Sequence, residues 1–438
     1  MNIQRTDTES ENRAESGLQC YVVGGAVRDR LLGLKVSDRD WVVVGSTTED
    51  MVRRGFRPVG KSFPVFLHPE TGEEYALART ERKISKGYTG FETHSDPTVT
   101  LDQDLLRRDL TINAIAEDKN GELIDPCKGS VDLKNKVIRH VSDAFEEDPL
   151  RVLRVARFAA RFNSLGFAVH QDTCRLMSRI ADSGELETLT AERCWLEISK
   201  ALQTDSFFRF IEVLRESSAL EIILPEVNAL FGVPQTKTYH PEVDTGTHLL
   251  MALRAVQQET RDPRIVFAVL LHDLGKALTP EEQWPKHRGH EQAGIEPVNR
   301  LCDRLKVPET YRRLALRVCE LHLLHHRFAE LKPATMLKMF EKLDYFRNPT
   351  HVEDFAIACR ADLRGRKGLQ NRPVPQTRLI KQAAQCLDSV DASSIAKQIT
   401  RDHDDGSSVG EKIAEGIRRQ RLAALKNLKK TWAVESSE

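Results

Sequence analysis

The chain has few aromatic residues, no excess charge of either sign and no long hydrophobic run. Aromatic residues make up 6% of its 438 residues, and 65 lysines and arginines balance 65 aspartates and glutamates. Without a net positive field, any contact with nucleic acid must come from local basic patches and should weaken with salt. No apolar run reaches the roughly 18 residues of a membrane helix, so no membrane span is expected.

Cysteine pairs at metal-ligand spacing are also lacking. The eight cysteines are scattered without a CxxC motif, so we interpret them as reduced, mostly buried thiols of a cytoplasmic protein. Residues 1–17 are polar and acidic and contain no apolar core. We therefore predict a disordered N-terminal extension at 1–17 rather than a signal peptide.

The hydrophobic periodicity changes along the chain. Up to about residue 140 strand-like and helical segments alternate, which predicts an α/β head. Residues 83–104 show no hydrophobic periodicity, which predicts a mobile loop over the active site. From Asp148 onward the spacing of apolar residues is helical. The predicted strands are 20–23, 40–44, 65–68, 74–80, 113–118 and 136–141, and the predicted helices of the head are 26–32, 47–54 and 106–111.

The most informative feature is a pair of aspartates, Asp38 and Asp40, that follows a glycine turn at Gly24-Gly25. Residues two apart on an extended strand face the same side, so both carboxylates should converge and share divalent cations. The glycines let the backbone approach a phosphate, and the following helix directs its N-terminus at that anion. This layout is typical of phosphoryl or nucleotidyl transfer.

Two arginine-rich segments add cationic groups. Arg107 and Arg108 precede an apolar strand and could bind a triphosphate. Alternatively, they are cations that only stabilise the C-terminus of a helix. After Asp148 and Pro149, which suit a helix start, four arginines recur at spacings of three and four. This basic stripe is either a solvated face or a binding surface, and it consists of Arg151, Arg154, Arg157 and Arg161.

A third cluster is rich in histidine, with eight of the fourteen histidines between residues 240 and 326. His272 and Asp273 are adjacent at the predicted end of a helix. Such a pair binds a metal only when distant ligands complete the shell. The residues available for this are His248, His287, His290, His322, His325 and Asp362.

These motifs together resemble a known family. The segments GGAVRD…DRD, RRDLTINA and EDPLRVLRVARFAAR occur in the order found in class II CCA-adding tRNA nucleotidyltransferases. The histidine cluster resembles the HD domain of the bacterial multifunctional form. The resemblance implies a polymerase-β-like head with a mixed sheet, followed only by helical parts, so that the fold is α+β in the head and mostly α overall. We expect the head at 18–140, a helical neck and body at 141–236, the HD phosphohydrolase domain at 237–346 and a helical tail at 347–438.

The resemblance also implies roles for single residues. Asp38 and Asp40 would be the catalytic residues and bind Mg²⁺, and a third carboxylate is left open between Glu74 and Asp109. A metal in the HD site, Ni²⁺ or another divalent ion, would be bound by His248, His272, Asp273, His290 and Asp362. The residues implied to contact the incoming nucleotide are Gly25, Arg28, Arg108, Arg154 and Arg157, and those implied to read its base are Glu147, Asp148 and Arg151.

The implied activity is addition and repair of the 3′-terminal CCA of tRNA from CTP and ATP without a template. The tRNA would be bound at its acceptor and TΨC arms. Phosphatase, 2′-nucleotidase and 2′,3′-cyclic phosphodiesterase activities would belong to the HD domain. The alternatives are a bacterial poly(A) polymerase and an HD phosphohydrolase whose head only binds RNA. The choices between full and partial CCA addition, and between monomer and dimer, stay open.

Overall fold

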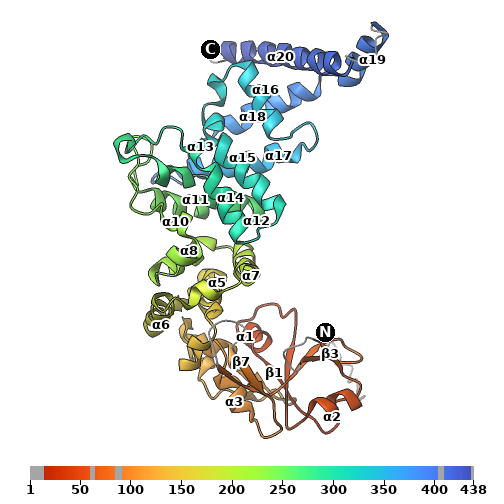
Figure 1. The fold of residues 1–438 in the computed structure, drawn as a ribbon, viewed down its shortest axis with the longest axis vertical. Helices are drawn as coiled ribbons and strands as arrows, with labels where there is room; N and C mark the ends of the chain where they lie inside the picture. Colours follow the sequence, from red (N-terminus) through yellow and green to blue (C-terminus); the bar gives the residue numbers. More distant parts are fainter. Residues whose placement is uncertain (1–13, 60–64, 84–90, 403–408, 436–438) are drawn as a thin grey trace, which may run out of the picture. The chain divides into compact units, whose positions relative to one another are not determined.

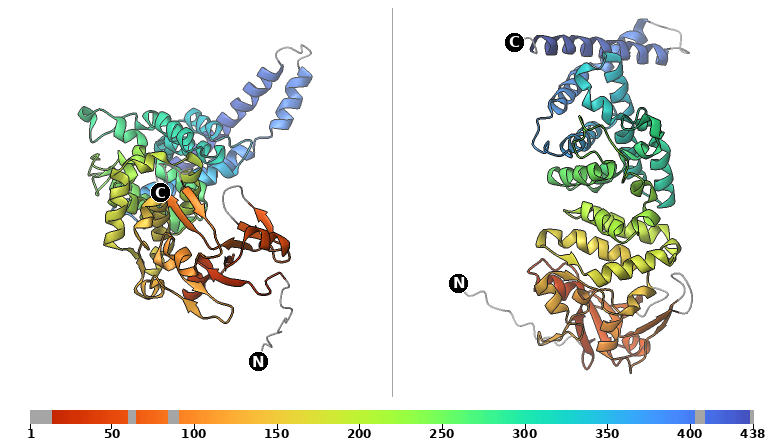
Figure 2. Two further views of the ribbon diagram at one scale, coloured as in Figure 1. Left: turned by 60° about the horizontal axis from the view of Figure 1, so that its bottom comes forward. Right: turned by 90° about the vertical axis from the view of Figure 1, so that its left-hand side faces the viewer.

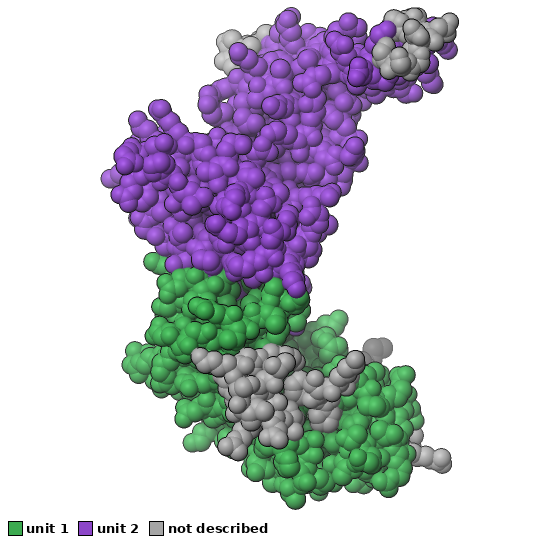
Figure 3. All heavy atoms as spheres, viewed as in Figure 1, with its two compact units in different colours: residues 1–198, 212–223 green, residues 199–211, 224–438 purple. Residues whose placement is uncertain are grey.

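The computed structural model describes residues 14–59, 65–83, 91–402 and 409–435, and it confines strands to the N-terminal part of the chain (Figure 1). Two compact units are present, Met1–Ile198 with Glu212–Ile223 and Ser199–Ile211 with Leu224–Glu438 (Figure 3). Among the described residues, no helix combines the length and apolar character needed to cross a bilayer. The predicted fold class, a mixed-sheet head followed by helices, is confirmed.

A seven-stranded mixed sheet forms the head, in the order β3-β4-β5-β2-β1-β8-β9. The central strand β2 is antiparallel to β1 and parallel to β5, which places the start of β2 beside the start of β5. The strands are β1 (Gln19–Val23), β2 (Asp40–Val44), β3 (Arg57–Val59), β4 (Val65–Leu67), β5 (Glu74–Leu77), β8 (Ala116–Glu117) and β9 (Leu123–Ile124).

Both faces of this sheet are covered. Val42 belongs to a core cluster with Leu105 and Ala114, whereas Val43 belongs to a second cluster with Phe56. Burial on both faces explains why β2 is continuously apolar after Asp40 rather than alternating. Ala14 is buried in the second cluster, so the described end of the predicted extension packs on the head, while residues 1–13 lie outside the described residues.

Two predictions for the head are wrong. The helix expected at 106–111 is α3 (Leu101–Leu106), because Thr100 and Gln103 form a capping box that starts it five residues earlier. The loop expected at 83–104 contains this helix and strand β7 (Phe91–His94), which pairs with β6 (Thr80–Lys83). Its residues 84–90 lie outside the described part. The remaining head helices are α1 (Gly25–Leu31), α2 (Thr48–Arg53) and α4 (Gly129–Asn135).

Helices make up nearly all of the chain after Pro149. In the second unit, α11, α12, α15 and α17 pack against one another and form the core of the HD part. Because α17 carries Asp362, the predicted domain end at 346 comes too early. Figure 2 shows α19 and α20 side by side. The helices named below are α5 (Leu150–Phe162), α7 (Ala191–Leu202), α11 (Thr245–Glu259), α12 (Pro263–Leu271), α13 (His290–Ala293), α15 (Glu309–His326), α17 (Thr350–Arg364), α19 (Ala392–Asp402) and α20 (Val409–Glu435).

Candidate active sites

The paired aspartates lie at one end of the head sheet. Asp40 is the first residue of β2, but Asp38 lies in the segment before the strand, so the prediction of one shared strand is wrong for Asp38. Both side chains are exposed, and they remain close enough for their charges to interact. Desolvation raises the pKa of Asp40, the Asp38 carboxylate adds to the rise, and the Arg108 guanidinium opposes it.

The structure separates the two candidates for a third carboxylate. Glu74 is the direct neighbour of Asp40 in the parallel pairing of β2 and β5, and its side chain is exposed. Asp109 is buried, and its oxygens accept hydrogen bonds from Arg154 Nε at 2.8 Å and from Asn113 Nδ2 at 3.0 Å. The geometry therefore favours Glu74 as a partner of Asp40, and Asp109 as a structural anion.

The glycine turn brings a cation to the same place. Gly24 has a φ of +69°, and a Cβ there would lie 3.0 Å from Arg108 Nη1. Arg108 Nη2 in turn donates to the buried Asp104 carboxylate at 3.0 Å. Arg107 also donates to Asp104 and, at 2.8 Å, to the carbonyl of Arg79. Of the two adjacent arginines, Arg108 is thus the one that the structure places beside the glycine turn.

Arg28 lies inside the protein rather than on its surface. Its side chain donates to Asp29 at 2.8 Å and to Asn113, and it lies 5.0 Å from the ring of Phe158. Burial lowers the pKa of Arg28, while the Asp29 carboxylate opposes that shift. Gly25, the first residue of α1, would place a Cβ 3.5 Å from Arg28 Nη2. The predicted contacts of both residues with a nucleotide stay predictions.

The arginine stripe on α5 faces acidic groups of the same unit. Arg157 Nε donates to Glu197 on α7 at 2.5 Å, and Arg161 Nη2 donates to Asp29 at 2.8 Å. With the bond from Arg154 to Asp109, three of the four arginines pair with carboxylates, so the stripe is more than a solvated face. Sequence reasoning missed Glu197, because nothing local connects it to a helix some forty residues earlier.

The predicted base-reading residues also have protein partners. The Asp148 carboxylate accepts from Arg193 Nη2 at 2.9 Å and from the backbone N–H of Leu150 at 3.1 Å. Arg151 is buried and donates to the carbonyls of Ala144 at 2.6 Å and Arg107 at 2.7 Å. Glu147 immediately precedes Asp148 at the end of a 3-10 helix. Arg193, which lies on α7, is a second residue that the sequence did not single out.

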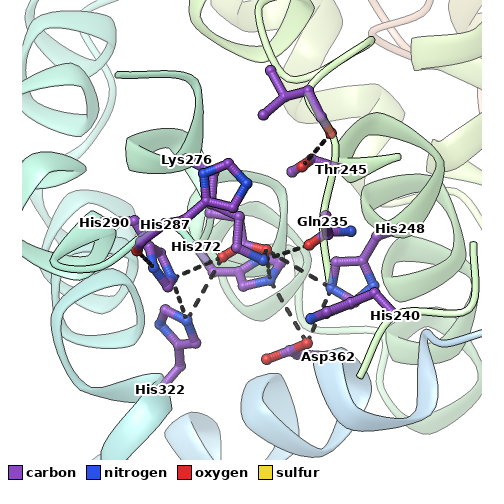
Figure 4. A network of polar contacts seen from close by, with 12 residues as sticks. Gln235, His240, Thr245, His248, His272, Lys276, His287, His290, His322 and Asp362 are labelled. Atoms are coloured by element: carbon purple, nitrogen blue, oxygen red, sulfur yellow. Dashed lines mark hydrogen bonds and ion pairs between the residues drawn. The ribbon is translucent and has the colours of Figure 1, made fainter. Parts of the chain in front are cut away.

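The second site is a buried cluster in the helical unit, which we call the HD centre. In Figure 4, His290 and His322 lie on one side of His272, and His248 and Asp362 lie on the other. All five predicted ligands are brought together. His322 on α15 joins them; the sequence offered it as a distant ligand, but the resemblance did not assign it. The HD centre consists of His248, His272, Asp273, His290, His322 and Asp362, each no more than 5% exposed.

A glycine makes this convergence sterically feasible. A Cβ on Gly275, two residues after Asp273, would lie only 1.9 Å from the carbonyl oxygen of His290. The chain after α12 can therefore pass directly against the start of α13, which carries His290. This contact explains why glycine belongs to the His-Asp-Leu-Gly segment.

The donor set of the HD centre fits a cation. His248 Nδ1 lies 3.0 Å from the Gly365 carbonyl, and His272 Nδ1 lies 2.7 Å from the Val269 carbonyl. Since carbonyls only accept, each neutral ring carries its hydrogen on Nδ1 and a lone pair on Nε2. Both Nε2 atoms are buried without a hydrogen-bond partner, at 3.0 and 3.9 Å from Asp362 Oδ1. A divalent ion would satisfy all three atoms.

The Asp109–Arg154 pair generates a pH prediction. Burial alone would raise the pKa of Asp109, but Arg154 and Asn113 more than offset this and hold it well below its usual range. The pair's contribution to the free energy of unfolding is therefore complete above about pH 3.9, the pKa of an aspartate in the unfolded chain. It is lost progressively as the pH falls below that value. We expect Asp109→Asn to lower the free energy of unfolding at pH 7 by about 3 kcal/mol, because Arg154 loses its charge partner.

Urea unfolding followed through Trp41 in the head sheet at pH 7 and pH 3 measures this effect. The difference between the parent and Asp109→Asn should shrink at pH 3. Asp102→Asn, an exposed carboxylate on α3, serves as the control and should change stability little at either pH. An equal loss at both pH values would contradict the assignment.

Comparisons with known proteins match both the head and the HD part of the chain. Family models match three parts of the chain: the poly A polymerase head domain at 20–139, the "Probable RNA and SrmB- binding site of polymerase A" at 166–231 and the HD domain at 245–392. A solved CCA-adding enzyme with CTP has a TM-score of 0.60 at 21% identity, covering 94% of this chain and 89% of that one. A Thermotoga maritima CCA-adding enzyme complexed with tRNA has a TM-score of 0.56 at 21% identity, covering 96% and 93%. These two likenesses support the fold.

Two further relatives are more similar to this chain in sequence than the solved structures are. A multifunctional CCA protein of Pseudomonas fluorescens is 51% identical over 416 residues, which cover 95% of this chain and 100% of that protein. One from Acinetobacter baumannii is 51% identical over 410 residues, which cover 94% and 98%. The resemblance in the sequence motifs is thereby confirmed, and the chain belongs to the family of multifunctional CCA proteins.

Proposed function

We propose that this enzyme adds and repairs the 3′-terminal CCA of tRNA, using CTP and ATP without a nucleic-acid template. The observation that carries the proposal is the head site. There Asp40 lies beside Glu74 in the sheet and under the electrostatic influence of both Asp38 and Arg108. Relatives at 51% identity carry the name multifunctional CCA protein.

In this proposal each group of the head site has a separate task. Asp38, Asp40 and Glu74 offer carboxylate oxygens, the ligands that Mg²⁺ prefers. Bound Mg²⁺ would supply Lewis-acid activation of the tRNA 3′-hydroxyl and stabilise the leaving pyrophosphate. Arg108 would neutralise the triphosphate, which can approach the backbone closely at Gly24.

Base selection would fall to the segment before α5. Cytosine and adenine both present an amino donor next to a ring-nitrogen acceptor, whereas uracil and guanine present the reverse. Asp148 would accept from the amino group, and Arg151 would donate to the ring nitrogen. A carboxylate has about four acceptor positions, so the bonds from Arg193 and Leu150 leave capacity for a base. Glu147 precedes this pair and belongs to the same motif.

The arginines of α5 support this site mainly by position. Arg154 and Arg157 use their Nε atoms on Asp109 and Glu197, which restrains each guanidinium and leaves its Nη atoms available for a ligand. We propose that both also contact the nucleotide. The tRNA would be recognised at its acceptor and TΨC arms through backbone and shape, which suits an A-form helix and a chain of zero net charge.

Removing the Asp40 charge tests the nucleotidyltransferase. Asp40→Asn should lower incorporation of CMP and AMP into tRNA lacking its 3′ end by about a hundredfold to a thousandfold or more, because metal binding is lost. Binding of the same tRNA in a filter assay should change less than about twofold, since the substitution touches no RNA contact of this proposal. Glu122→Gln, an exposed carboxylate between β8 and β9, is the control. Full activity of Asp40→Asn would refute the assignment, and long tails made from ATP alone would favour the poly(A) polymerase.

Base selection is tested at Asp148. Asp148→Ala should reduce the preference for CTP and ATP over UTP and GTP about tenfold to a hundredfold, the cost of one unpaired buried polar group. Single-nucleotide incorporation with each of the four triphosphates measures this ratio. Glu146→Gln, an exposed acid of the same segment, should keep the parent's preference. Unchanged discrimination by Asp148→Ala would exclude the base-reading role.

We propose further that the HD centre hydrolyses phosphate esters, including 2′,3′-cyclic phosphates, 2′-nucleotides and phosphomonoesters. Its imidazole-rich ligands suit Ni²⁺ and similar ions better than Mg²⁺. Such an ion would activate water at neutral pH. Lys276 is buried beside the centre, and its ammonium group donates at 2.7 Å to both Asp273 and Gln235. This positive charge would attract the phosphate of a substrate.

His272→Ala tests this second activity. Hydrolysis of 2′,3′-cyclic AMP should fall at least about a hundredfold, because one ligand of the centre is lost. CCA addition should persist, since none of the proposed head ligands is altered. His351→Gln, a histidine that contacts the Leu343 carbonyl outside the centre, is the control. Equal hydrolysis by the parent and His272→Ala would rule out this site.

A further inference from the structure

Gln235, a buried residue beside the HD centre, carries an unused hydrogen-bond donor. It lies in the segment that leads into α11, and it is only 2% exposed. Lys276 Nζ donates to its Oε1 atom at 2.7 Å. Because an ammonium group can only donate, this contact fixes which end of the amide is the oxygen. The other end, Nε2, is buried without a hydrogen-bond partner among the described residues.

The backbone around Gln235 is held in place. The N–H of Gln235 donates to the Val243 carbonyl at 2.5 Å. The carbonyl of the preceding residue, Pro234, lies 2.7 Å from His287 Nε2, which donates to it because a carbonyl only accepts. With the backbone and the Oε1 atom both held, Nε2 cannot turn to solvent without breaking one of these bonds.

Lys276 also has a donor to spare. Its ammonium group has three hydrogens, and two of them go to Gln235 Oε1 and Asp273 Oδ2, each at 2.7 Å. In the part of the chain that the structure describes, the third has no partner. Figure 4 shows Gln235 and Lys276 at the same centre as His272. Two neighbouring side chains thus bring unused N–H groups to the HD centre.

These two donors specify the kind of ligand that fits. The ligand must accept from an amide N–H and from an ammonium N–H at neighbouring positions. A cation bound by His248, His272 and Asp362 would also attract negative charge. A phosphate group is anionic and has several acceptor oxygens, so it meets both requirements. Pairing with a phosphate oxygen would also relieve the cost of a donor that is buried without a partner.

We propose that Gln235 binds the phosphate of the substrate in the HD centre. Its Nε2 atom donates to one non-bridging oxygen, and Lys276 donates to another. This inference rests on the proposed phosphohydrolase function and deepens it. Because the amide is neutral, it binds the singly charged diester of a 2′,3′-cyclic phosphate as well as a phosphate monoester.

Two roles of Gln235 have to be separated. Its Oε1 atom holds Lys276 in position, whereas its Nε2 atom would contact the phosphate. A residue that only positioned Lys276 would have no effect once the ammonium group is gone. A residue that binds the phosphate itself keeps an effect of its own, and a double-mutant cycle with Lys276 distinguishes the two cases.

Phosphate binding can be measured without turnover. The full-length chain carries Asp38→Asn and Asp40→Asn to remove proposed metal ligands in the head, and it is loaded with Mn²⁺. Inorganic phosphate is titrated in, and the relaxation of its ³¹P nuclear magnetic resonance signal by the bound Mn²⁺ gives the dissociation constant. Gln235→Met should raise this constant about tenfold to a hundredfold, the loss expected for one hydrogen bond to a charged group.

The cycle adds Lys276→Met and the double variant. In the Lys276→Met background, Gln235→Met should still weaken phosphate binding about tenfold, because its own donor is lost. Gln258→Met, which alters an exposed glutamine on α11, is the control and should bind phosphate like the parent. Thermal unfolding checks that each variant is folded. If Gln235→Met is not, Gln235→Asn replaces it, since its shorter side chain withdraws the amide from the centre.

An unchanged dissociation constant in Gln235→Met would overturn the proposal. A double variant that binds phosphate no more weakly than Lys276→Met would do so too, and so would loss of Mn²⁺ from Gln235→Met. Failure of the proposed function looks different. A chain that binds phosphate through Gln235 but hydrolyses no 2′,3′-cyclic AMP refutes the phosphohydrolase and leaves this contact standing. A chain that hydrolyses the ester with phosphate affinity independent of Gln235 does the opposite.

Discussion

The structure depends on one constraint at both of its sites: a charge that is buried must meet an opposite charge or a fixed set of donors. In the head, Asp104 and Asp109 meet this requirement through Arg108 and Arg154. The Asp104–Arg108 pair is local to the end of α3, whereas the Asp109–Arg154 pair joins α5 to the segment that follows α3. In the HD centre the carboxylates face imidazole lone pairs instead, and a cation is the partner that completes them.

This difference separates structural from functional acids. Asp109 is held by Arg154 and Asn113, so it stabilises the fold and has little capacity left for a metal. Asp40 and Glu74 are exposed neighbours across two parallel strands, and the pKa of Asp40 is raised rather than lowered. Desolvation and the neighbouring Asp38 charge raise the pKa of Asp40, and a bound cation would favour its charged form.

The two activities proposed for the chain use metals of different character. The head offers exposed carboxylate oxygens where the central strands β2 and β5 begin, which suits a hard ion that keeps water ligands and binds together with a triphosphate. The HD centre offers buried imidazoles whose tautomers are set by backbone carbonyls, which suits a more strongly held, borderline ion. One chain can thus extend an RNA end in one unit and hydrolyse phosphate esters in the other.

The sequence by itself determined the family, the mixed-sheet head and most of the candidate ligands, because glycine turns, paired acids and His-Asp segments are local patterns. It offered His322 without assigning it, and it did not reveal Arg193 or Glu197, since each joins its site only through contacts between segments far apart in the chain. Tertiary structure also gave Glu74 and Asp109 different surroundings. Strand register places Glu74 beside Asp40, whereas Asp109 is buried and paired with Arg154. Pairing and burial depend on three-dimensional neighbours, and no spacing along the chain encodes them.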